Sequence, residues 1–313
     1  MEITARRSTW KTLGAFAIIY FVWGSTFLAI RIGVHEVPPF LFAAIRFGIA
    51  GVALYGWMIA RGERSPTMRE WGSAFLLALL IFVCNYGLLF WAEKRVPSGI
   101  AAVIRATIPL FIALTEIIVL RTQRLTLRLA LGLVIGIGGV AVLMSRSLNL
   151  GGAPVETAGA VAIVFGAMSW SVASVLTRKM PLPESKVMSA GAQMIAGGLM
   201  LAILSVGLGE LRGFHPLAVS RAAWMSMVFL IVAGSILGFT AYVWLIGHES
   251  PTKVGTYAYV NPVVAVLLGY FMGGESLGLR VVLGTVFVLI SVVVITTMRE
   301  TKLVLAAAME DER

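Results

Sequence analysis

The sequence predicts an all-α membrane protein of about ten transmembrane helices, built as two five-helix repeats that enter the membrane from opposite faces. Three observations predict this fold class: the composition, the length of the apolar runs and an internal repeat. Of the 313 residues, 59% are hydrophobic and 13% are charged, and the mean hydropathy is +0.93. A soluble domain carries about 25% charged residues, so the composition excludes an ordinary soluble domain.

The apolar runs have the length of membrane-spanning helices. Runs such as residues 12–29 and 281–298 approach the ~20 residues that a helix needs to cross ~30 Å of hydrocarbon. Prolines, glycines and charge clusters separate each run from the next, and the connections are short. These breaks predict ten spans, near residues 12–33, 39–60, 71–93, 97–120, 126–145, 156–178, 187–208, 223–246, 252–272 and 279–298.

The positive charges fall unequally on the two sets of loops. One side of the membrane is predicted to hold sixteen lysines and arginines and the other side seven, while Arg46 and Arg105 lie inside spans. Cytoplasmic loops carry the excess of positive charge, so both termini are expected in the cytoplasm, in agreement with an even number of spans. The first apolar run is too long for a signal-peptide core, and we interpret it as a retained helix.

The two halves of the chain repeat one another. A shift of 147 residues places Trp23 on Trp170 and Arg31 on Arg178. A shift of 152 to 154 residues carries the pattern onward, and it aligns two pairs of prolines, Pro97 with Pro251 and Pro109 with Pro262. The predicted domains are therefore residues 1–150, with spans one to five, and residues 151–313, with spans six to ten and a short cytoplasmic tail.

Each predicted repeat holds an odd number of spans. Because five spans bring the chain to the opposite face, the second copy must be inverted in the membrane. Inverted repeats are a recognised build of secondary transporters, whose substrate binds near the midplane where the repeats meet. The alternative is a duplication kept only for stability. For a membrane chain without a soluble domain, transport is favoured.

Three ionisable side chains lie inside the predicted spans or at their ends. Arg46 lies about two turns into span two, Arg105 about two turns into span four, and Glu93 ends span three. Ionisable groups in a membrane cost a few kcal/mol or more, so each is a candidate functional residue. We expect Glu93 and Arg46 to act in coupling or in a gate. A salt-bridged cluster of Glu93 with one or both arginines is physically plausible. The alternative is that Glu93 only neutralises a structural arginine, or faces water at the helix end.

Two prolines are expected to act as hinges. Pro109 and Pro262 lie near mid-membrane at matching positions of the two repeats. Each removes a helix hydrogen bond and frees a carbonyl, which a cavity tolerates and lipid does not. Side chains at similar depth form, with Arg105, the candidate substrate-binding set: Trp23, Asn85, Tyr86, Ser169, Trp170, Tyr257 and Asn261. For any single aromatic residue the alternative role is packing.

Other classes of partner and cofactor are not expected. The net charge of +10 falls at the ends of apolar runs, which indicates a membrane protein and not a nucleic-acid-binding one. The three histidines, His35, His215 and His248, are too scattered for a metal site. Neither a nucleotide-binding loop nor a metal or nucleophile motif occurs, so we expect no cofactor and no enzymatic activity. Cys84 is the only cysteine and excludes an intramolecular disulfide.

The expected partners are a small-molecule substrate, the lipid bilayer and protons. Three pairs of glycines are spaced for close helix packing, at residues 132 and 136, 234 and 238, and 269 and 273. Packing within the chain explains them as well as dimerisation does. We therefore expect a monomer or a weak homodimer.

Four segments resemble the EamA-type members of the drug/metabolite transporter superfamily. They are residues 23–31, 38–47, 91–102 and 257–269, and the similarity extends over almost the whole chain, from Leu13 to Thr297. The resemblance implies ten helices in two five-helix EamA repeats, with cytoplasmic termini. It also implies export of amino acids or related small metabolites through a central cavity, walled mainly by spans one, three, four, six, eight and nine.

Several residues match recurrent positions of that family, and two places depart from it. The matching residues are Trp23, Glu93, Pro97, Pro109, Asn261, Pro262 and Glu275. Arg105 stands where the family usually has an aliphatic residue, which indicates a preference for an anionic group on the substrate. The turn after span four, Arg121-Thr-Gln-Arg124, lacks the Gly-Glu found at Gly274-Glu275. An acid in the turn of the first repeat is therefore not expected to be essential.

The leading hypothesis is a secondary active transporter that exports small metabolites, in particular amino acids or related compounds, across the plasma membrane by alternating access. In a bacterium this is the inner membrane. Within transport, the alternatives are multidrug or nucleoside-type efflux and uptake. A channel is disfavoured because mid-span prolines within an inverted repeat suit alternating access. An intramembrane enzyme, the rival from another class, would need a constellation of residues that the sequence lacks.

Overall fold

The fold is that of a computed structural model, which describes residues 2–118, 125–144, 155–249 and 254–294. All regular elements in these ranges are helical, which confirms the all-α prediction. Eight helical segments are long and apolar enough to cross a membrane: Trp10–Val34, Pro39–Ala60, Met68–Glu93, Ser98–Ile118, Leu127–Met144, Thr157–Leu176, Lys186–Gly207 and Arg221–Leu245. Two shorter apolar helices, Tyr257–Phe271 and Leu279–Val294, coincide with the ninth and tenth expected spans. Ten complete spans stay a prediction.

Three of the long segments change from α-helix to π-helix partway along. This was not predicted from the sequence. A π-helix has hydrogen bonds from residue i to i+5 and occurs frequently at functional sites. The first segment consists of α1 (Glu2–Ala17), η1 (Ile18–Val22) and α2 (Trp23–Val34). The third consists of α4 (Met68–Ala78), η2 (Leu79–Gly87) and α5 (Leu88–Glu93). The eighth consists of α11 (Arg221–Phe229), η4 (Leu230–Leu237) and α12 (Gly238–His248).

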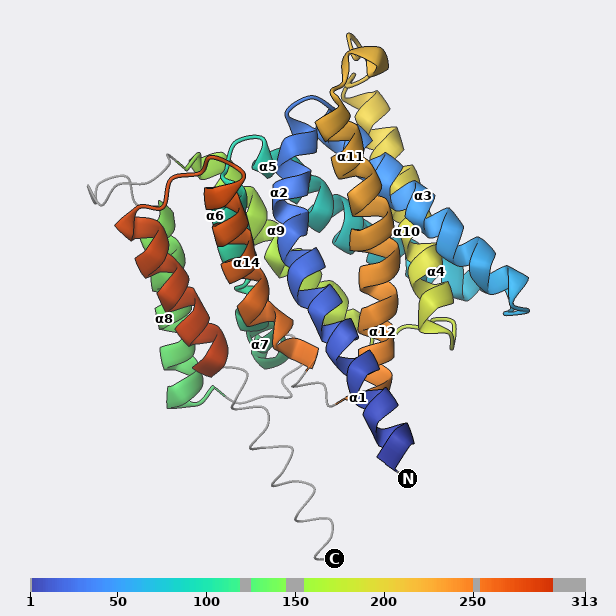
Figure 1. The fold of residues 1–313 in the computed structure, drawn as a ribbon, viewed down its shortest axis with the longest axis horizontal. Helices are drawn as coiled ribbons and strands as arrows, with labels where there is room; N and C mark the ends of the chain where they lie inside the picture. The colour runs from blue at the N-terminus through green and yellow to red at the C-terminus, as the bar shows by residue number, and fades with distance from the viewer. Residues whose placement is uncertain (1, 119–124, 145–154, 250–253, 295–313) are drawn as a thin grey trace, which may run out of the picture.

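The second and seventh spans, α3 (Pro39–Ala60) and α10 (Lys186–Gly207), are equivalent in the two repeats and lie side by side (Figure 1). Glycines bring their backbones together. A Cβ added to Gly51 would lie 2.7 Å from the backbone nitrogen of Ile195, and one added to Gly198 would lie 2.7 Å from that of Gly48. Because a real Cβ cannot approach so closely, any larger residue at either position would force the two helices apart.

A second pair of helices lies at the opposite edge of the molecule, where α8 (Leu127–Met144) runs beside the helix Leu279–Val294 (Figure 1). Ser291 Oγ donates to the carbonyl of Gly132 at 2.6 Å, and a Cβ on Gly139 would lie 3.0 Å from the backbone nitrogen of Val288. The small residues of α8 therefore serve packing within the chain.

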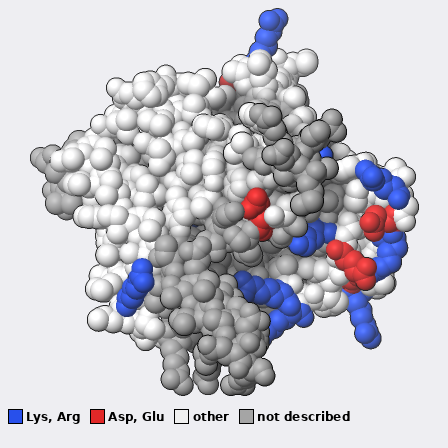
Figure 2. All heavy atoms as spheres, turned by 60° about the horizontal axis from the view of Figure 1, so that its bottom comes forward, with Lys and Arg blue, Asp and Glu red and all other residues white. Residues whose placement is uncertain are grey.

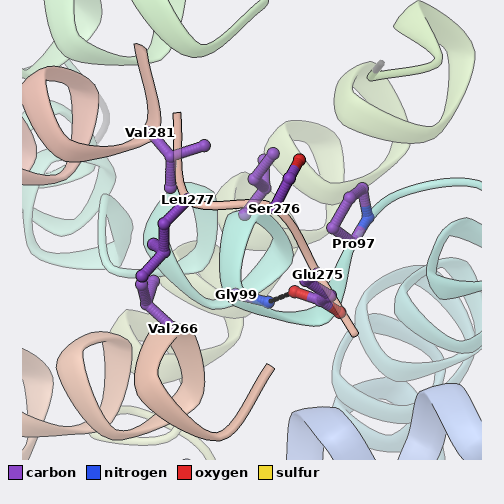
Figure 3. A pocket seen from close by; sticks show the side chains of 8 residues that line it. Pro97, Gly99, Val266, Glu275, Ser276, Leu277 and Val281 are labelled. Carbon is purple, nitrogen blue, oxygen red and sulfur yellow. Dashed lines mark hydrogen bonds between the residues drawn. The ribbon is translucent and has the colours of Figure 1, made fainter. Parts of the chain in front are cut away.

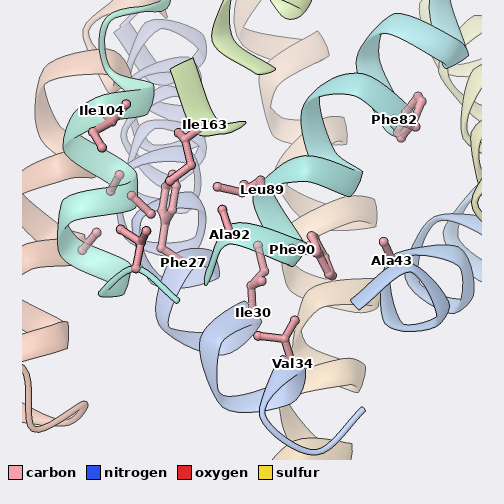
Figure 4. Packing of buried hydrophobic residues seen from close by; sticks show 14 of the residues in the cluster. Phe27, Ile30, Val34, Ala43, Phe82, Leu89, Phe90, Ala92, Ile104 and Ile163 are labelled. Atoms are coloured by element: carbon pink, nitrogen blue, oxygen red, sulfur yellow. The ribbon is translucent and has the colours of Figure 1, made fainter. Parts of the chain in front are cut away.

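The interior between these edges is apolar and is built from both repeats. Phe27, Ile30 and Val34 of α2 lie near Leu89 and Phe90 of α5 (Figure 4), and all five are buried. On the surface, charged side chains gather toward one side, and a broad area carries none (Figure 2). That distribution suits a belt of lipid around the bundle.

The remaining helices complete the framework of the site. They are α6 (Ser98–Arg105), α7 (Ile108–Ile118), α9 (Thr157–Leu176), α14 (Tyr257–Phe271) and the short 3₁₀ helix η3 (Pro216–Ala218). At the end of the bundle predicted to face outward, carboxylates of one repeat accept hydrogen bonds from helix starts of the other. Glu36 accepts from Ser220 before α11, Glu210 from Phe40 and Leu41 of α3, and Glu275 from Ser98 and Gly99 of α6. Anionic groups are favourable at helix N-termini because the helix dipole is positive there. Since the carboxylate and the helix belong to different repeats in each case, these contacts join the repeats.

Candidate functional site

Arg105 lies where the fourth span is broken. Helix α6 ends at Arg105 and α7 begins at Ile108, and the hydroxyl of Thr107 donates to the carbonyl of Ile104 at 2.6 Å within the break. Pro109 is the second residue of α7, where a backbone N–H has no helical partner in any case. The predicted hinge at Pro109 therefore lies beside an actual interruption of the span.

The guanidinium of Arg105 lies between two aromatic rings and one amide. Its central carbon lies 4.5 Å from the ring centroid of Tyr86 and 5.5 Å from that of Trp170. Its Nη1 donates to Asn85 Oδ1 at 3.0 Å. Tyr86 and Trp170 meet edge to face, with centroids 5.9 Å apart. Cation–π contacts with two rings stabilise the charge where water is scarce.

One edge of that guanidinium is left free. Arg105 Nε and Nη2 donate to no group in the described part of the chain, and neither atom is fully buried. These two nitrogens form a fork that matches the two oxygens of a carboxylate. The arrangement can therefore bind a carboxylate side-on without displacing Asn85.

Arg46 is more deeply buried than Arg105, and only 3% of its surface is exposed. Its Nε donates to Ser235 Oγ of η4 at 3.1 Å, and its guanidinium lies 4.7 Å from the Phe47 ring and 5.7 Å from the Tyr86 ring. Its Nη1 is buried and has no hydrogen-bond partner in the part of the chain that the structure describes. Arg46 thus joins a helix of the first repeat to a π-helix of the second, and it shares Tyr86 with Arg105.

Glu93 forms no salt bridge with either arginine, so the expected cluster is wrong. The carboxylate is 0% exposed, and both of its oxygens lack a hydrogen-bond partner among the described residues. The physical reason is that Ser235, Asn85 and the aromatic rings already hold the two guanidiniums.

An ion pair closes the end of the bundle that is predicted to face outward. Arg31 Nε lies 3.4 Å from Glu275 Oε1, and Arg31 Nη1 also donates to the carbonyls of Glu93 and Val96. Glu275 accepts three hydrogen bonds from the start of α6: from Ser98 N at 2.6 Å and Ser98 Oγ at 2.7 Å, and from Gly99 N at 3.0 Å (Figure 3). The cavity beside it measures only about 10 Å³, which leaves room for at most one water molecule.

A second ion pair lies at the other end of the bundle. Arg178 Nη1 lies 3.3 Å from Glu116 Oε1. Arg178 is the residue that the 147-residue shift aligns with Arg31. Each pair therefore joins the end of the first span of one repeat to the region where the fourth span of the other repeat ends. Arg121 and Arg124, which follow Glu116 in the turn after span four, lie outside the described residues.

Two of the predicted binding residues donate side-chain hydrogen bonds to carbonyls of π-helices. Trp23 Nε1 donates to Gly234 O of η4 at 3.1 Å, and Ser169 Oγ donates to Leu80 O of η2 at 2.9 Å. In both cases the first span of one repeat contacts the third span of the other. The polar atoms of Trp23 and Ser169 therefore hold the repeats together, which the sequence did not indicate.

Asn261 has a similar structural role. With the amide nitrogen facing the carbonyls around it, Asn261 donates to Ile19 O and Tyr20 O of η1 at 3.1 Å each and to Tyr257 O at 3.3 Å. Its side chain is 8% exposed. Pro262 follows directly and lies inside α14, which continues through it. Span nine is therefore tied to span one at this depth, and unlike Pro109, Pro262 lies at no break.

A second aromatic group contains a residue that the sequence analysis missed. The ring centroid of Trp23 lies 5.2 Å from that of Tyr257, edge to face, and 5.4 Å from that of Tyr242. The contact has a counterpart in the other repeat, because Trp170, which the repeat aligns with Trp23, also packs on a tyrosine, Tyr86. Tyr242 also meets Tyr257 edge to face, with ring centroids 6.1 Å apart.

An open apolar cavity lies elsewhere. It measures about 300 Å³ and lies among α7, α8 and α9, with walls that are almost entirely apolar, including Leu110, Ile137 and Val161. Its chemistry suits hydrocarbon and offers no group that would orient a polar ligand. Within the described ranges no three of His, Cys, Asp and Glu lie together as metal ligands would.

The fold and the site define a class: a polytopic helical membrane protein whose two related halves meet around a charged and aromatic centre. Comparison with known families makes this specific. The EamA-like transporter family matches the chain twice, over residues 10–145 and 157–297. The chain belongs to this family and is a membrane transporter.

Relatives and a solved structure agree with this assignment. The chain is 39% identical over 266 residues to "Uncharacterized inner membrane transporter YedA" of Escherichia coli K12, covering 84% of this chain and 83% of that one. It is 28% identical to "Protein PecM" of Dickeya dadantii, with 88% of each chain covered. A structure titled "Crystal structure of protein" has the same fold, with a TM-score of 0.59 and 24% identity over 93% of this chain and 97% of that one. The protein is a multi-pass protein of the bacterial inner membrane.

Proposed function

We propose that the chain is a secondary active transporter that exports small metabolites with a carboxylate, amino acids or related compounds, by alternating access. The observation that carries this proposal is the free Nε and Nη2 edge of Arg105. A charged donor pair that is held by neighbours and left unpaired at the centre of a bundle suits an anionic ligand. A lone arginine in a membrane interior would otherwise be costly.

The surroundings of Arg105 suit a substrate with both a carboxylate and an apolar body. Tyr86 and Trp170 offer ring surface beside the fork, and Trp23, Tyr242 and Tyr257 form a second group of aromatic rings among spans one, eight and nine. Aromatic rings bind apolar side chains by burying large areas. Amino acids with apolar side chains combine a carboxylate with an apolar body in one small molecule.

Two ion pairs support alternating access. Arg31 with Glu275 and Arg178 with Glu116 occupy corresponding places at opposite ends of the bundle, and each joins the two repeats. Opening one pair while keeping the other would admit substrate from one side only. Inverted repeats allow such exchange because the two forms are of similar energy.

The proposal is tested by metabolite profiling followed by flux. Media from overexpressing and deletion cells identify compounds whose export depends on the chain, and the purified protein is then assayed with them in proteoliposomes. Arg105→Leu should lose preference for the carboxylate over neutral or cationic compounds. Arg105→Lys should transport carboxylates more weakly, because an ammonium cannot form the planar fork. Arg61→Leu, which removes an exposed arginine that contacts Trp57, is the matched control and should transport normally.

Unaltered selectivity of Arg105→Leu at normal protein level would contradict carboxylate recognition and leave the arginine with a structural role. Net inward flux under a physiological gradient would contradict export. Catalytic conversion of the compound in sealed proteoliposomes would support the enzyme alternative.

A further inference from the structure

The side-chain amide of Asn85 is engaged at both ends. Asn85 lies in η2 and is 2% exposed. Its Nδ2 donates to the carbonyl of Ile81 at 3.2 Å, and its Oδ1 accepts from Arg105 Nη1 at 3.0 Å. A guanidinium can only donate and a carbonyl can only accept. The amide therefore has one satisfied orientation, which connects the π-helix backbone to Arg105.

This connection fixes how the guanidinium is turned. Asn85 holds Nη1, while the rings of Tyr86 and Trp170 lie 4.5 Å and 5.5 Å from its centre and limit its rotation. The edge that remains is formed by Nε and Nη2. A guanidinium that is already oriented loses less conformational freedom when a ligand binds.

We propose that Asn85 is a positioning residue that orients Arg105 so that its Nε and Nη2 edge meets the substrate carboxylate. Asn85 does not itself contact the substrate, because its amide is buried and both of its polar atoms are engaged. This replaces the direct binding role expected from the sequence. The inference rests on the proposed function, since it concerns the same site and adds how that site recognises its ligand.

The π-helix is part of the arrangement. In an α-helix the carbonyl of Ile81 would accept from the backbone N–H of Asn85, four residues on. In a π-helix it accepts from the residue five positions on, so the side chain of Asn85 reaches this carbonyl in place of its own backbone. The wide turn of η2 therefore sets where the amide lies, and through it where Arg105 points.

The experiment compares a carboxylate with its carboxamide. The probes are L-phenylalanine and L-leucine, each paired with its amide, and transport is measured in proteoliposomes of wild type, Asn85→Ala, Arg105→Leu and the double variant. Asn85→Ala should raise KM for the carboxylate about tenfold, the loss of roughly one hydrogen bond to a charged group. The KM for the amide and kcat for both should stay unchanged. Gln193→Ala, which removes a carboxamide bonded to Ser189 outside the site, is the matched control.

The double variant separates positioning from a general structural role. If Asn85 acts through Arg105, adding Asn85→Ala to Arg105→Leu should change nothing further, because the two effects are not additive. Equal losses for carboxylate and amide, or an undiminished effect in the Arg105→Leu background, would overturn the inference.

A second substitution covers failure of Asn85→Ala to fold. Asn85→Asp keeps the shape of the side chain and gives Arg105 a carboxylate that competes with the substrate, so it should also weaken carboxylate transport and spare the amide. Normal carboxylate transport by Asn85→Asp would overturn the inference. If Arg105→Leu alone leaves the preference for carboxylate over amide intact, the proposed function fails instead. If the wild type transports neither amino acid, both proposals fail for this substrate class.

Discussion

Among the buried glutamates of the described chain, Glu93 differs in its surroundings. Glu70 pairs with Arg64 at 2.6 Å, and Glu116 pairs with Arg178 at 3.3 Å. Both oxygens of Glu93 are buried and accept no hydrogen bond from any described residue. An ionised carboxylate cannot stay in such a place without compensation. During a transport cycle it must therefore meet a proton, a water molecule or one of the nearby arginines.

This makes Glu93 the candidate for proton coupling. Glu93→Gln should abolish uphill flux driven by a pH gradient, because the amide carries no exchangeable charge, while counterflow between equal pools should continue. Both are measured in proteoliposomes with an imposed pH difference. Glu63→Gln, the same change on an exposed turn, should leave both unchanged. Concentration of substrate by Glu93→Gln in response to the gradient would exclude this role.

Glu36 gives a pH-dependent contact outside the spans. Hydrogen bonds from the side chain and the backbone of Ser220 lower the pKa of Glu36 from its ordinary value. A lowered pKa means that the folded state favours the ionised form. The contact is therefore fully present above the ordinary glutamate pKa of about 4.3 and is lost as pH falls through the lowered value.

We accordingly expect acid to loosen the junction between the loop after α2 and the start of α11. Hydrogen exchange at the first residues of α11 should rise as pH falls below about 4.3, after correction for the intrinsic rate. In Glu36→Gln the same amides should exchange faster already at neutral pH and lose this pH dependence. A pH dependence that persists in Glu36→Gln would assign it to another group.

At the scale of single elements, the two predicted hinge prolines differ. Pro109 lies at the start of α7, beside the break after Arg105, whereas Pro262 lies inside α14. A proline within a helix removes a hydrogen bond that an ordinary residue would make, and one at the first turn removes none. Pro262 should therefore destabilise its helix more than Pro109 does.

Pro262→Ala should stabilise the protein by up to ~3 kcal/mol and slow transport, since α14 would become less able to bend. Pro109→Ala is the matched control, and its effect on stability should stay within about 1 kcal/mol. Thermal unfolding in detergent and flux in proteoliposomes give the two readouts. A larger stabilisation from Pro109→Ala than from Pro262→Ala would reverse the assignment.

The π-helices act at the same scale. They interrupt the α-helix of the third and eighth spans at corresponding positions, η2 and η4, and one carbonyl of each also accepts a hydrogen bond from a side chain of the other repeat. Each π-helix thus supplies a hydrogen-bond acceptor to a neighbouring helix, and its own hydrogen bonds depart from the regular α-helical pattern. The contact that results is specific to one register of the two helices.

Across the whole molecule, the two inter-repeat ion pairs should respond separately. Arg31→Gln should raise hydrogen exchange at the start of α6, where Glu275 accepts from Ser98 and Gly99. Arg178→Gln should raise exchange at the far end, in the last turns of α7 and α9. The first effect should be larger because Arg31 also holds two carbonyls. Equal changes at both ends in either variant would contradict independent gates.

The orientation of the whole molecule is testable on its own. Both termini are predicted in the cytoplasm, so a reporter active only outside the cytoplasm should give no signal when fused to the C-terminus. Fusion of the same reporter after Gly213, in a loop predicted to lie outside, serves as the positive control. Strong signal from the C-terminal fusion would refute the model of ten spans.

The sequence by itself determined the class of the protein and the course of its spans. Eight of the ten expected spans coincide with long apolar helices to within a few residues, because crossing a membrane requires a local run of apolar residues that can be read one segment at a time. The same local logic located Arg46, Glu93 and Arg105 as exceptions within apolar surroundings, and the repeat aligned Arg31 with Arg178.

Only the tertiary structure decided which atoms those residues engage. Arg46 donates to Ser235, 189 residues away, and Glu93 has no hydrogen-bond partner within the described ranges. Four residues that were expected to bind substrate instead form hydrogen bonds to neighbouring groups of the fold: Asn85, Trp23, Ser169 and Asn261. The physical reason is that burial follows from local apolarity, whereas a hydrogen-bond partner depends on angles and distances of about 3 Å between helices remote in sequence. The free edge of Arg105 is what remains after all its neighbours have been placed.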